Sequence, residues 1–150
     1  MAVLFVVAQV VRPEHTNPAS NPNEHITAKL AVHPEVAATL ERACSDCHSN
    51  NTAWPWYSNV APASWLVVND VKQGRNELNF SLWGKYSGEE QQELLGKMCK
   101  EVKEGEMPDS VYTLAHPKAR LSAGDRQALC SWTNTLAATL PGEKEEEESD

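Results

Sequence analysis

The segment Cys44-Ser45-Asp46-Cys47-His48 has the form C-x-x-C-H. In this form, two cysteines become thioethers on the vinyl groups of a haem, and the adjacent histidine becomes an axial ligand of its iron. At the end of a helix, cysteines three residues apart project from neighbouring faces and reach two vinyls on one porphyrin edge. The histidine then turns its imidazole under the ring. The motif predicts one covalently attached haem c, held through Cys44 and Cys47 with His48 on the iron.

Three other interpretations of the motif compete with haem attachment. A redox-active C-x-x-C pair belongs in a βαβ context, which the sequence does not show. A zinc site needs a second closely spaced ligand pair, whereas Cys99 and Cys130 lie 31 residues apart. Two unreactive core cysteines beside an unrelated histidine are the third interpretation. All three fit the sequence less well than haem attachment does.

The sixth position on the iron takes a second ligand or is open. Met107 lies in Gly105-Glu106-Met107-Pro108, 59 residues after His48, where glycine and proline indicate a loop that lets the thioether point inward. Met98 falls on the apolar face of a predicted helix, where core packing is the expected use. His116 is the second candidate and an open position the third. Methionine opposite histidine favours electron transfer, whereas an open face favours ligand binding or activation.

The composition is that of one globular domain. The chain has 150 residues, of which 41% are hydrophobic and 23% charged, so a buried core is expected and a disordered or fibrous chain is excluded. The net charge is −8, and residues 143–150 hold six acids and one lysine. Because the chain carries no basic stripe, we exclude nucleic acid as a partner.

Helical periodicity dominates the sequence, and no segment after residue 34 alternates as a strand does. Pro34 occupies a first-turn position, and Ser87 and Glu90 have the spacing of a capping box. The predicted helices are 34 to 47, Pro62 to Gln73 with Gly74 as its stop, Ser87 to near Gly105, and Ser122 to Leu140 before Pro141-Gly142. The predicted fold class is all-α with long loops.

The chain divides into four parts. Residues 1–11 are nearly continuous apolar sequence, about half the length that spans a bilayer, so they are either the end of a membrane anchor or a shorter hydrophobic peg. A buried strand ended by Arg12-Pro13 is the alternative. Residues 12–33 are rich in proline and asparagine and are predicted to be a tether, with His15, His25 and His33 solvated. The haem domain is expected at 34–142, and an acidic disordered tail at 143–150.

A wider set of residues accompanies the motif. It comprises Ser49-Asn50, Trp54-Pro55-Trp56-Tyr57-Ser58, Ala61-Pro62, Ser64-Trp65, Asp70, Gly74-Arg75, Leu78-Asn79, Trp83, Met107-Pro108, Tyr112 and His116-Pro117. With the motif, this set resembles the haem-binding domain family of monohaem c-type cytochromes over roughly residues 26 to 140. The resemblance implies a small helical fold similar to class I cytochromes c. It also implies Cys44 and Cys47 as attachment points, His48 as the proximal ligand and Met107 as the distal ligand.

Aromatic residues after the motif are candidates for haem contacts. Indole N–H and phenol O–H groups can donate to haem propionates, while the rings exclude water. The candidates are Trp54, Trp56, Tyr57 and Trp65, with Arg75 as a partner for a propionate. The alternatives are core packing for the aromatic residues and solvent for the arginine. Core packing is favoured for Trp65, Trp83 and Trp132, because each lies on or near a helical apolar face.

Cys99 and Cys130 fall on the third and fourth predicted helices, which antiparallel packing would bring together. Covalent haem attachment implies assembly outside the cytoplasm, where disulfides are permitted. We therefore favour a disulfide between Cys99 and Cys130 over two buried thiols. Such a bond, if unstrained, would contribute about 3–4 kcal/mol.

These observations together favour an electron-transfer protein rather than an enzyme. A single haem c between His48 and Met107 would exchange one electron at a time with membrane-associated redox proteins, on the periplasmic side of the cytoplasmic membrane. The chain would act as a mobile or tethered carrier or as a subunit of a respiratory or photosynthetic complex. A haem sensor or a peroxidase is the alternative if the distal position is open or labile.

Overall fold

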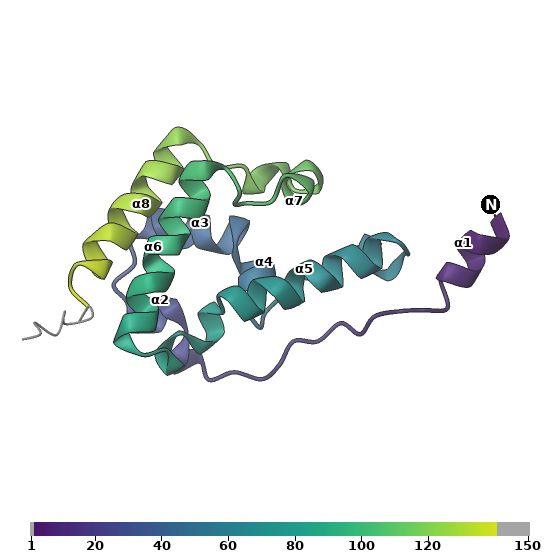
Figure 1. Cartoon of the computed structure of the whole chain (residues 1–150), viewed down its shortest axis with the longest axis horizontal. Coiled ribbons are helices and arrows are strands. Elements are labelled where there is room, and N and C mark those ends of the chain that lie inside the picture. Colours follow the sequence, from purple (N-terminus) through teal and green to yellow (C-terminus); the bar gives the residue numbers. More distant parts are fainter. Residues whose placement is uncertain (1, 141–150) are drawn as a thin grey trace, which may run out of the picture.

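The computed structural model describes residues 2–140, and every regular element in that range is helical (Figure 1). The predicted all-α class is therefore confirmed. The α-helices are α1 (Ala2–Ala8), α2 (Ile26–Lys29), α3 (Pro34–Ala43), α4 (Ser45–His48), α5 (Ala63–Glu77), α6 (Gly88–Glu104), α7 (Ser110–Ala115) and α8 (Ala123–Ala137). The 3-10 helices are η1 (Pro22–Glu24), η2 (Trp56–Asn59), η3 (Phe80–Lys85) and η4 (Pro117–Ala119). The acidic tail predicted at 143–150 lies outside the described residues.

The prediction of one continuous helix from 34 to 47 is wrong. The segment forms α3 and a separate single turn, α4, because Cys44 leaves the helical region at φ −129°. The Ser45 hydroxyl donates to the Leu40 carbonyl (3.2 Å), which closes the end of α3. The break turns α4 and its histidine out of the line of α3, so the motif occupies its own turn.

Helix α5 continues past its predicted stop. Gly74 was expected to end it, but the helix runs on to Glu77 and ends at the extended residue Leu78. Gly74 is needed for a different reason, because a Cβ built there would lie 2.7 Å from the carbonyl oxygen of Cys47. The glycine therefore lets α5 pack directly against the motif.

Local capping signals predicted the starts of α6 and α8 correctly. Ser87 and Glu90 form a reciprocal capping box at α6, which ends at Gly105 with a φ of +80°. Ser122 forms the corresponding box with Asp125 at α8. Helix α8 ends at Ala137, three residues before the predicted Leu140, and Pro141-Gly142 lies outside the described residues.

Helices α6 and α8 pack against each other (Figure 1), and a disulfide between Cys99 and Cys130 joins them. Trp83 and Trp132 are buried at 0% and 6% exposure, which confirms their predicted place in the core. Ile26 is also fully buried, although it belongs to the region predicted as a tether. The core residues are Ile26, Val36, Leu40, Ala43, Leu78, Phe80, Trp83, Leu95, Met98, Val102, Ala119, Leu121, Leu129 and Trp132.

The N-terminal region runs alongside α5 and is bound to it. Residues 2–8 form helix α1 rather than the alternative buried strand, and α1 lies at one end of the molecule in Figure 1. The extended segment that follows is hydrogen-bonded to the domain through His15, Asn17 and other residues. His25 caps α2, and only His33 is the exposed loop histidine that was predicted. Within the described residues, no helix combines the length and hydropathy needed to cross a bilayer.

Asp125 joins α3 to the start of α8. Its Oδ2 accepts from the Ser122 backbone N–H (2.8 Å), and Arg42 Nη2 lies 2.8 Å from the same oxygen. The Thr39 hydroxyl donates to Oδ1 at 3.3 Å. The Ser122 hydrogen bonds and the Arg42 charge hold the Asp125 pKa at about 2. This carboxylate therefore links the helix that precedes the motif to the C-terminal helix.

We expect Asp125→Asn to lower the free energy of unfolding by about 1 kcal/mol at neutral pH, because hydrogen bonds to a charged group are lost. The folded pKa lies below the unfolded value, so the ionised carboxylate stabilises the fold above about pH 4. That stabilisation is lost as the pH falls towards 2, where the variant and the unaltered chain converge. Urea unfolding across this pH range measures the difference. Glu93→Gln, which breaks the exposed Lys97–Glu93 pair, is the control and should change stability by only a few tenths of a kcal/mol.

Candidate haem site

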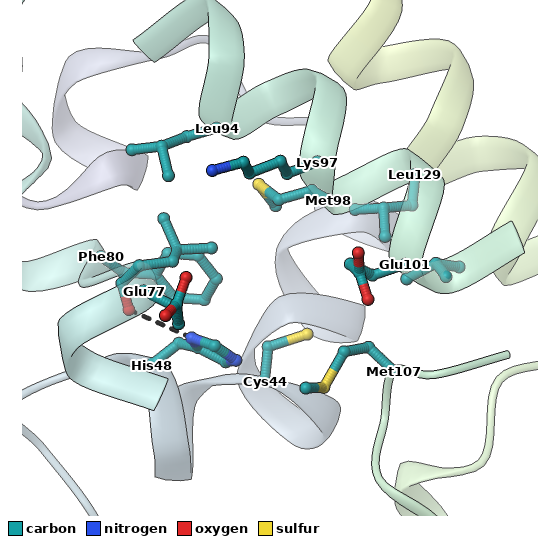
Figure 2. Close-up of a pocket in the computed structure, with 12 residues that line it drawn as sticks. Cys44, His48, Glu77, Phe80, Leu94, Lys97, Met98, Glu101, Met107 and Leu129 are labelled. Carbon is teal, nitrogen blue, oxygen red and sulfur yellow. Dashed lines mark hydrogen bonds between the residues drawn. The ribbon is translucent and has the colours of Figure 1, made fainter. Parts of the chain in front are cut away.

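Two adjoining cavities flank the C-x-x-C-H motif. The larger has a volume of about 340 Å³ and the smaller about 230 Å³. Cys44, His48, Glu77 and Met107 line both of them. The larger is walled mainly by apolar side chains from η3, α6 and α8, as Figure 2 shows. The volume and the apolar walls of the larger cavity are typical of cofactor sites.

The end of α5 sets the orientation of the His48 ring. His48 Nδ1 lies 2.9 Å from the Gly74 carbonyl oxygen and 3.1 Å from that of Leu78. A carbonyl only accepts, so Nδ1 carries the proton and Nε2 keeps its lone pair. Figure 2 shows this second nitrogen turned towards the cavity. Burial lowers the His48 pKa, which favours the neutral imidazole that binds metal.

Both motif cysteines are free thiols in the structure. Cys44 lines both cavities, and Cys47 lines the smaller one and a third pocket next to α7. Burial raises the pKa of Cys44 to about 12 and that of Cys47 to about 11, so both are protonated at neutral pH. A pair of separate thiols beside a metal-competent imidazole is the donor set that covalent haem attachment needs.

The structure does not support the zinc interpretation of these cysteines. The second ligand pair would have to include Cys99 and Cys130, which are bonded to each other. Among residues 2–140, no group of three or more histidine, cysteine or acidic side chains is arranged to hold a metal ion. The residues present fit a haem, whose four equatorial nitrogens come from the porphyrin itself.

Two methionines reach the larger cavity, although the sequence pointed to one. Met107 lines both cavities from the loop after α6 and is 40% exposed. Met98 belongs to the core as predicted, yet it also lines the larger cavity from α6. His116, the second predicted candidate, lines neither cavity that His48 lines, and its Nε2 is hydrogen-bonded to the Tyr57 hydroxyl (3.1 Å). The structure thus brings Met107 to His48 and keeps His116 away.

Arg75 takes a role that neither prediction described. Its Nε donates to the Ser49 carbonyl (2.7 Å), and its Nη atoms donate to Thr52 Oγ1 (2.8 Å), the Thr16 carbonyl (2.7 Å) and Asn17 Oδ1 (3.0 Å). It lines neither cavity, and the half-buried side chain is hydrogen-bonded to two segments of the chain rather than free in solvent. The guanidinium therefore ties the N-terminal region to the loop that follows the motif.

Lys97 lines the larger cavity and places a positive charge on its wall. No sequence pattern indicated this position. Lys97 lies on α6, and its Nζ is 2.7 Å from the Glu93 carboxylate. Figure 2 shows Lys97 beside Leu94 and Met98 on one wall of the cavity. Glu93 and Lys97 have the i, i+4 spacing of an ordinary surface ion pair, so only the tertiary structure places Lys97 at the site.

The four aromatic candidates lie outside both cavities beside His48. Trp54 stacks on His15 with centroids 4.4 Å apart, and Trp56 is 78% exposed. The core position favoured for Trp65 is wrong, since it is 41% exposed and its indole donates to the Val11 carbonyl. Tyr57 lines the third pocket with His116. Phe80, which no pattern singled out, is the aromatic residue that lines the larger cavity.

Asp46 anchors the motif from the side of α7. Its Oδ2 accepts from the Tyr112 hydroxyl at 2.9 Å, and its Oδ1 accepts from the Ala53 backbone N–H at 3.0 Å. The Tyr112 pKa is raised by burial and by this carboxylate, so the phenol remains a donor. One variable residue inside C-x-x-C-H thus holds both the following loop and α7.

We expect Gly74→Ala to destabilise the fold by about 1–3 kcal/mol, because the added methyl collides with the Cys47 carbonyl and forces α4 away from α5. Gly96→Ala is the matched control, since it lies within α6 and a Cβ there meets no atom within 4 Å. Alanine at Gly96 should stabilise the chain by about 0.5–1 kcal/mol. Denaturant unfolding measures the stability of both variants. If Gly74→Ala stabilised the chain as much as Gly96→Ala, the close contact between α5 and the motif would be disproved.

The chain matches the family model described as Haem-binding domain over residues 3–135. This match begins well before residue 26, where the resemblance seen in the sequence starts, and so takes in the N-terminal region that Arg75 binds. No curated protein and no solved structure shows a significant match. With the match spanning most of its length, the chain belongs to the haem-binding domain family.

Proposed function

We propose that the protein is a monohaem c-type cytochrome with a class I-like fold that carries single electrons. The observation that carries the proposal is the convergence of Cys44, His48 and Met107 on the same two cavities. A haem bound there supplies a one-electron Fe(III)/Fe(II) couple. In this proposal the protein transfers electrons and transforms no substrate.

The motif residues hold the cofactor by distinct chemistry. Cys44 and Cys47 would hold the haem by adding S–H across its vinyl C=C bonds, each addition forming one S–C and one C–H bond as the double bond becomes single. His48 Nε2 would bind the iron, with Nδ1–H held by the carbonyls of Gly74 and Leu78. Phe80, Leu94 and the other apolar side chains of the larger cavity exclude water and so raise the reduction potential.

The proposed partners are redox proteins at a membrane, on its periplasmic or outer face. Covalent haem attachment and the Cys99–Cys130 disulfide both suit an oxidising compartment. The apolar residues 1–11 support contact with the membrane. Both a mobile carrier and a fixed subunit of a respiratory or photosynthetic complex use this chemistry.

One observation favours a haem sensor or peroxidase as the second candidate. Met107 is 40% exposed and lies in a loop beside the exposed residues Gly105 and Glu106, so its thioether is held less firmly than a ligand on a helix. A small molecule that displaced the Met107 thioether would bind the iron in its place. Tight binding of cyanide or carbon monoxide to the unaltered protein would favour this candidate over electron transfer.

We expect the haem to remain on the chain after denaturation and acid–acetone extraction, as mass spectrometry would show. Cys44→Ala/Cys47→Ala should lose it under the same treatment, because no thioether can form. Cys99→Ala/Cys130→Ala removes the same number of sulfurs outside the site and should retain it. Loss of haem from the unaltered protein would refute covalent attachment.

We expect Met107→Ala to abolish the near-infrared thioether-to-iron band of the ferric protein and to lower its midpoint potential, because the thioether stabilises the ferrous state. Met98→Leu conserves volume and removes the other thioether that lines the larger cavity, so it should keep the band. Optical spectra with redox titration measure both effects. The reverse result, with the band lost only in Met98→Leu, would assign the distal position to α6.

A further inference from the structure

The exposed large apolar side chains are concentrated at one end of the described chain. They come from two segments, namely α1 with the residues just after it and the region from η2 to the first turn of α5. The members are Val3, Leu4, Phe5, Val6, Val7, Val10, Val11, Trp56, Val60, Trp65 and Leu66. We call this set the apolar end; Met107, Val111 and Leu114 are the other large apolar residues with comparable exposure among those described.

Both segments are free of charge. Residues 1–11 contain no acidic or basic side chain, and neither do residues 49–69, although charged residues make up 23% of the chain. Two hydrogen-bonded contacts bring the segments together. Gln9 exchanges hydrogen bonds with the backbone of Ala61 (2.9 and 3.2 Å), and the Trp65 indole donates to the Val11 carbonyl (2.8 Å). The fold therefore assembles one uncharged apolar surface from distant parts of the sequence.

Helix α1 is exposed on every side. Leu4, Phe5, Val6 and Val7 follow one another at about 100° per residue and so point around the whole circumference of the helix. Their exposed fractions are 70%, 52%, 64% and 58%. A helix that docks on a protein needs one apolar face, whereas a helix that is apolar all round is suited to surroundings that are apolar on all sides.

The connection between α1 and the domain is firmly held. His15 Nε2 is hydrogen-bonded to the Ser58 carbonyl (2.9 Å), and Asn17 donates to the Thr52 carbonyl (3.0 Å). Arg75 binds the Thr16 carbonyl at 2.7 Å. With the Gln9 and Val11 contacts above, these hydrogen bonds hold the segment against η2, α5 and the loop after the motif, so the domain does not swing freely about it.

We infer that the apolar end is a membrane-docking surface, in which Trp56, Trp65 and Leu66 of the haem domain enter the lipid interface together with α1. The inference rests on the membrane contact proposed above for residues 1–11 and extends it to the domain itself. Tryptophan is enriched at the membrane–water boundary, where its ring meets acyl chains and its N–H meets polar groups. The exposed apolar side chains of α1 would enter the same interface.

Lipid suits this surface better than a protein partner does. Protein interfaces usually carry a polar rim with charged residues, which would complement charges on the partner. The apolar end offers no charge in either segment to form such a rim. A second copy of the chain would cover one side of α1 and leave its other sides in water.

Docking at this surface would fix the distance between the haem site and the membrane. Helix α5 begins at the apolar end with Ala63, and Gly74, which holds His48, lies 11 residues further along. At 1.5 Å per residue this separation is about 16 Å along the helix axis. The cavities would therefore face partners from a fixed position near the lipid rather than from the end of a free tether.

The experiment is flotation of the full haem-loaded chain with vesicles of phosphatidylcholine, a lipid without net charge. We expect the unaltered chain to float with the vesicles and Trp56→Asp and Leu66→Asp each to lower the partition coefficient by about tenfold or more. Gln127→Asp is the matched control, because it adds the same charge at an exposed position on α8 and should change nothing. Amide hydrogen exchange on the vesicles should slow within residues 53–67.

Three results would contradict the inference. Equal flotation of the unaltered chain, Trp56→Asp and Leu66→Asp would overturn it and leave α1 as the sole contact with the membrane. Failure of the unaltered chain to float would overturn both the inference and the proposed membrane contact. A dimer in sedimentation that Trp56→Asp dissociates would assign the surface to a second copy and overturn it as well. None of these results depends on the redox couple, so the proposed electron transfer is tested separately.

Discussion

The hydrogen bonds from His48 Nδ1 to the carbonyls of Gly74 and Leu78 are the interaction on which the rest of the site depends. They fix the tautomer, so Nε2 keeps its lone pair and faces the cavity. They also require α4 to lie directly on α5, which is sterically allowed only because residue 74 lacks a Cβ. The last turn of α5 thus replaces the rigid scaffold that a single-turn helix such as α4 cannot provide for itself.

Helix α5 also connects the haem site to the remainder of the chain. Near its C-terminal end, Arg75 binds both the loop after the motif, through Ser49, and the N-terminal segment, through Thr16. At its N-terminal end, Trp65 binds the backbone of Val11. A region rich in proline and asparagine therefore behaves as part of the domain, because its carbonyls find donors on α5 that composition alone does not reveal.

The sequence predicted elements well where the determining contacts are local. The capping box of Ser87 and Glu90 lies within four residues, so the start of α6 follows from the sequence by itself. Gly74 shows the opposite case, because a glycine after an apolar stretch commonly ends a helix, yet here it accommodates a carbonyl from another element. The prediction for Trp65 failed for a related reason, since a helical apolar face becomes core only if another element covers it.

The proposed chemistry of attachment follows from the sequence by itself, because thioether formation and proximal ligation would depend on residue types and on spacing within five consecutive residues, Cys44 to His48. The all-α class and the caps of the later helices were determined in the same local way. Only the tertiary structure decided that Met107 and Met98 share a cavity, that His116 does not, and that the two uncharged apolar segments meet at one end. Those outcomes depend on which distant surfaces pack together, and packing between elements leaves no periodic signal in any single stretch of sequence.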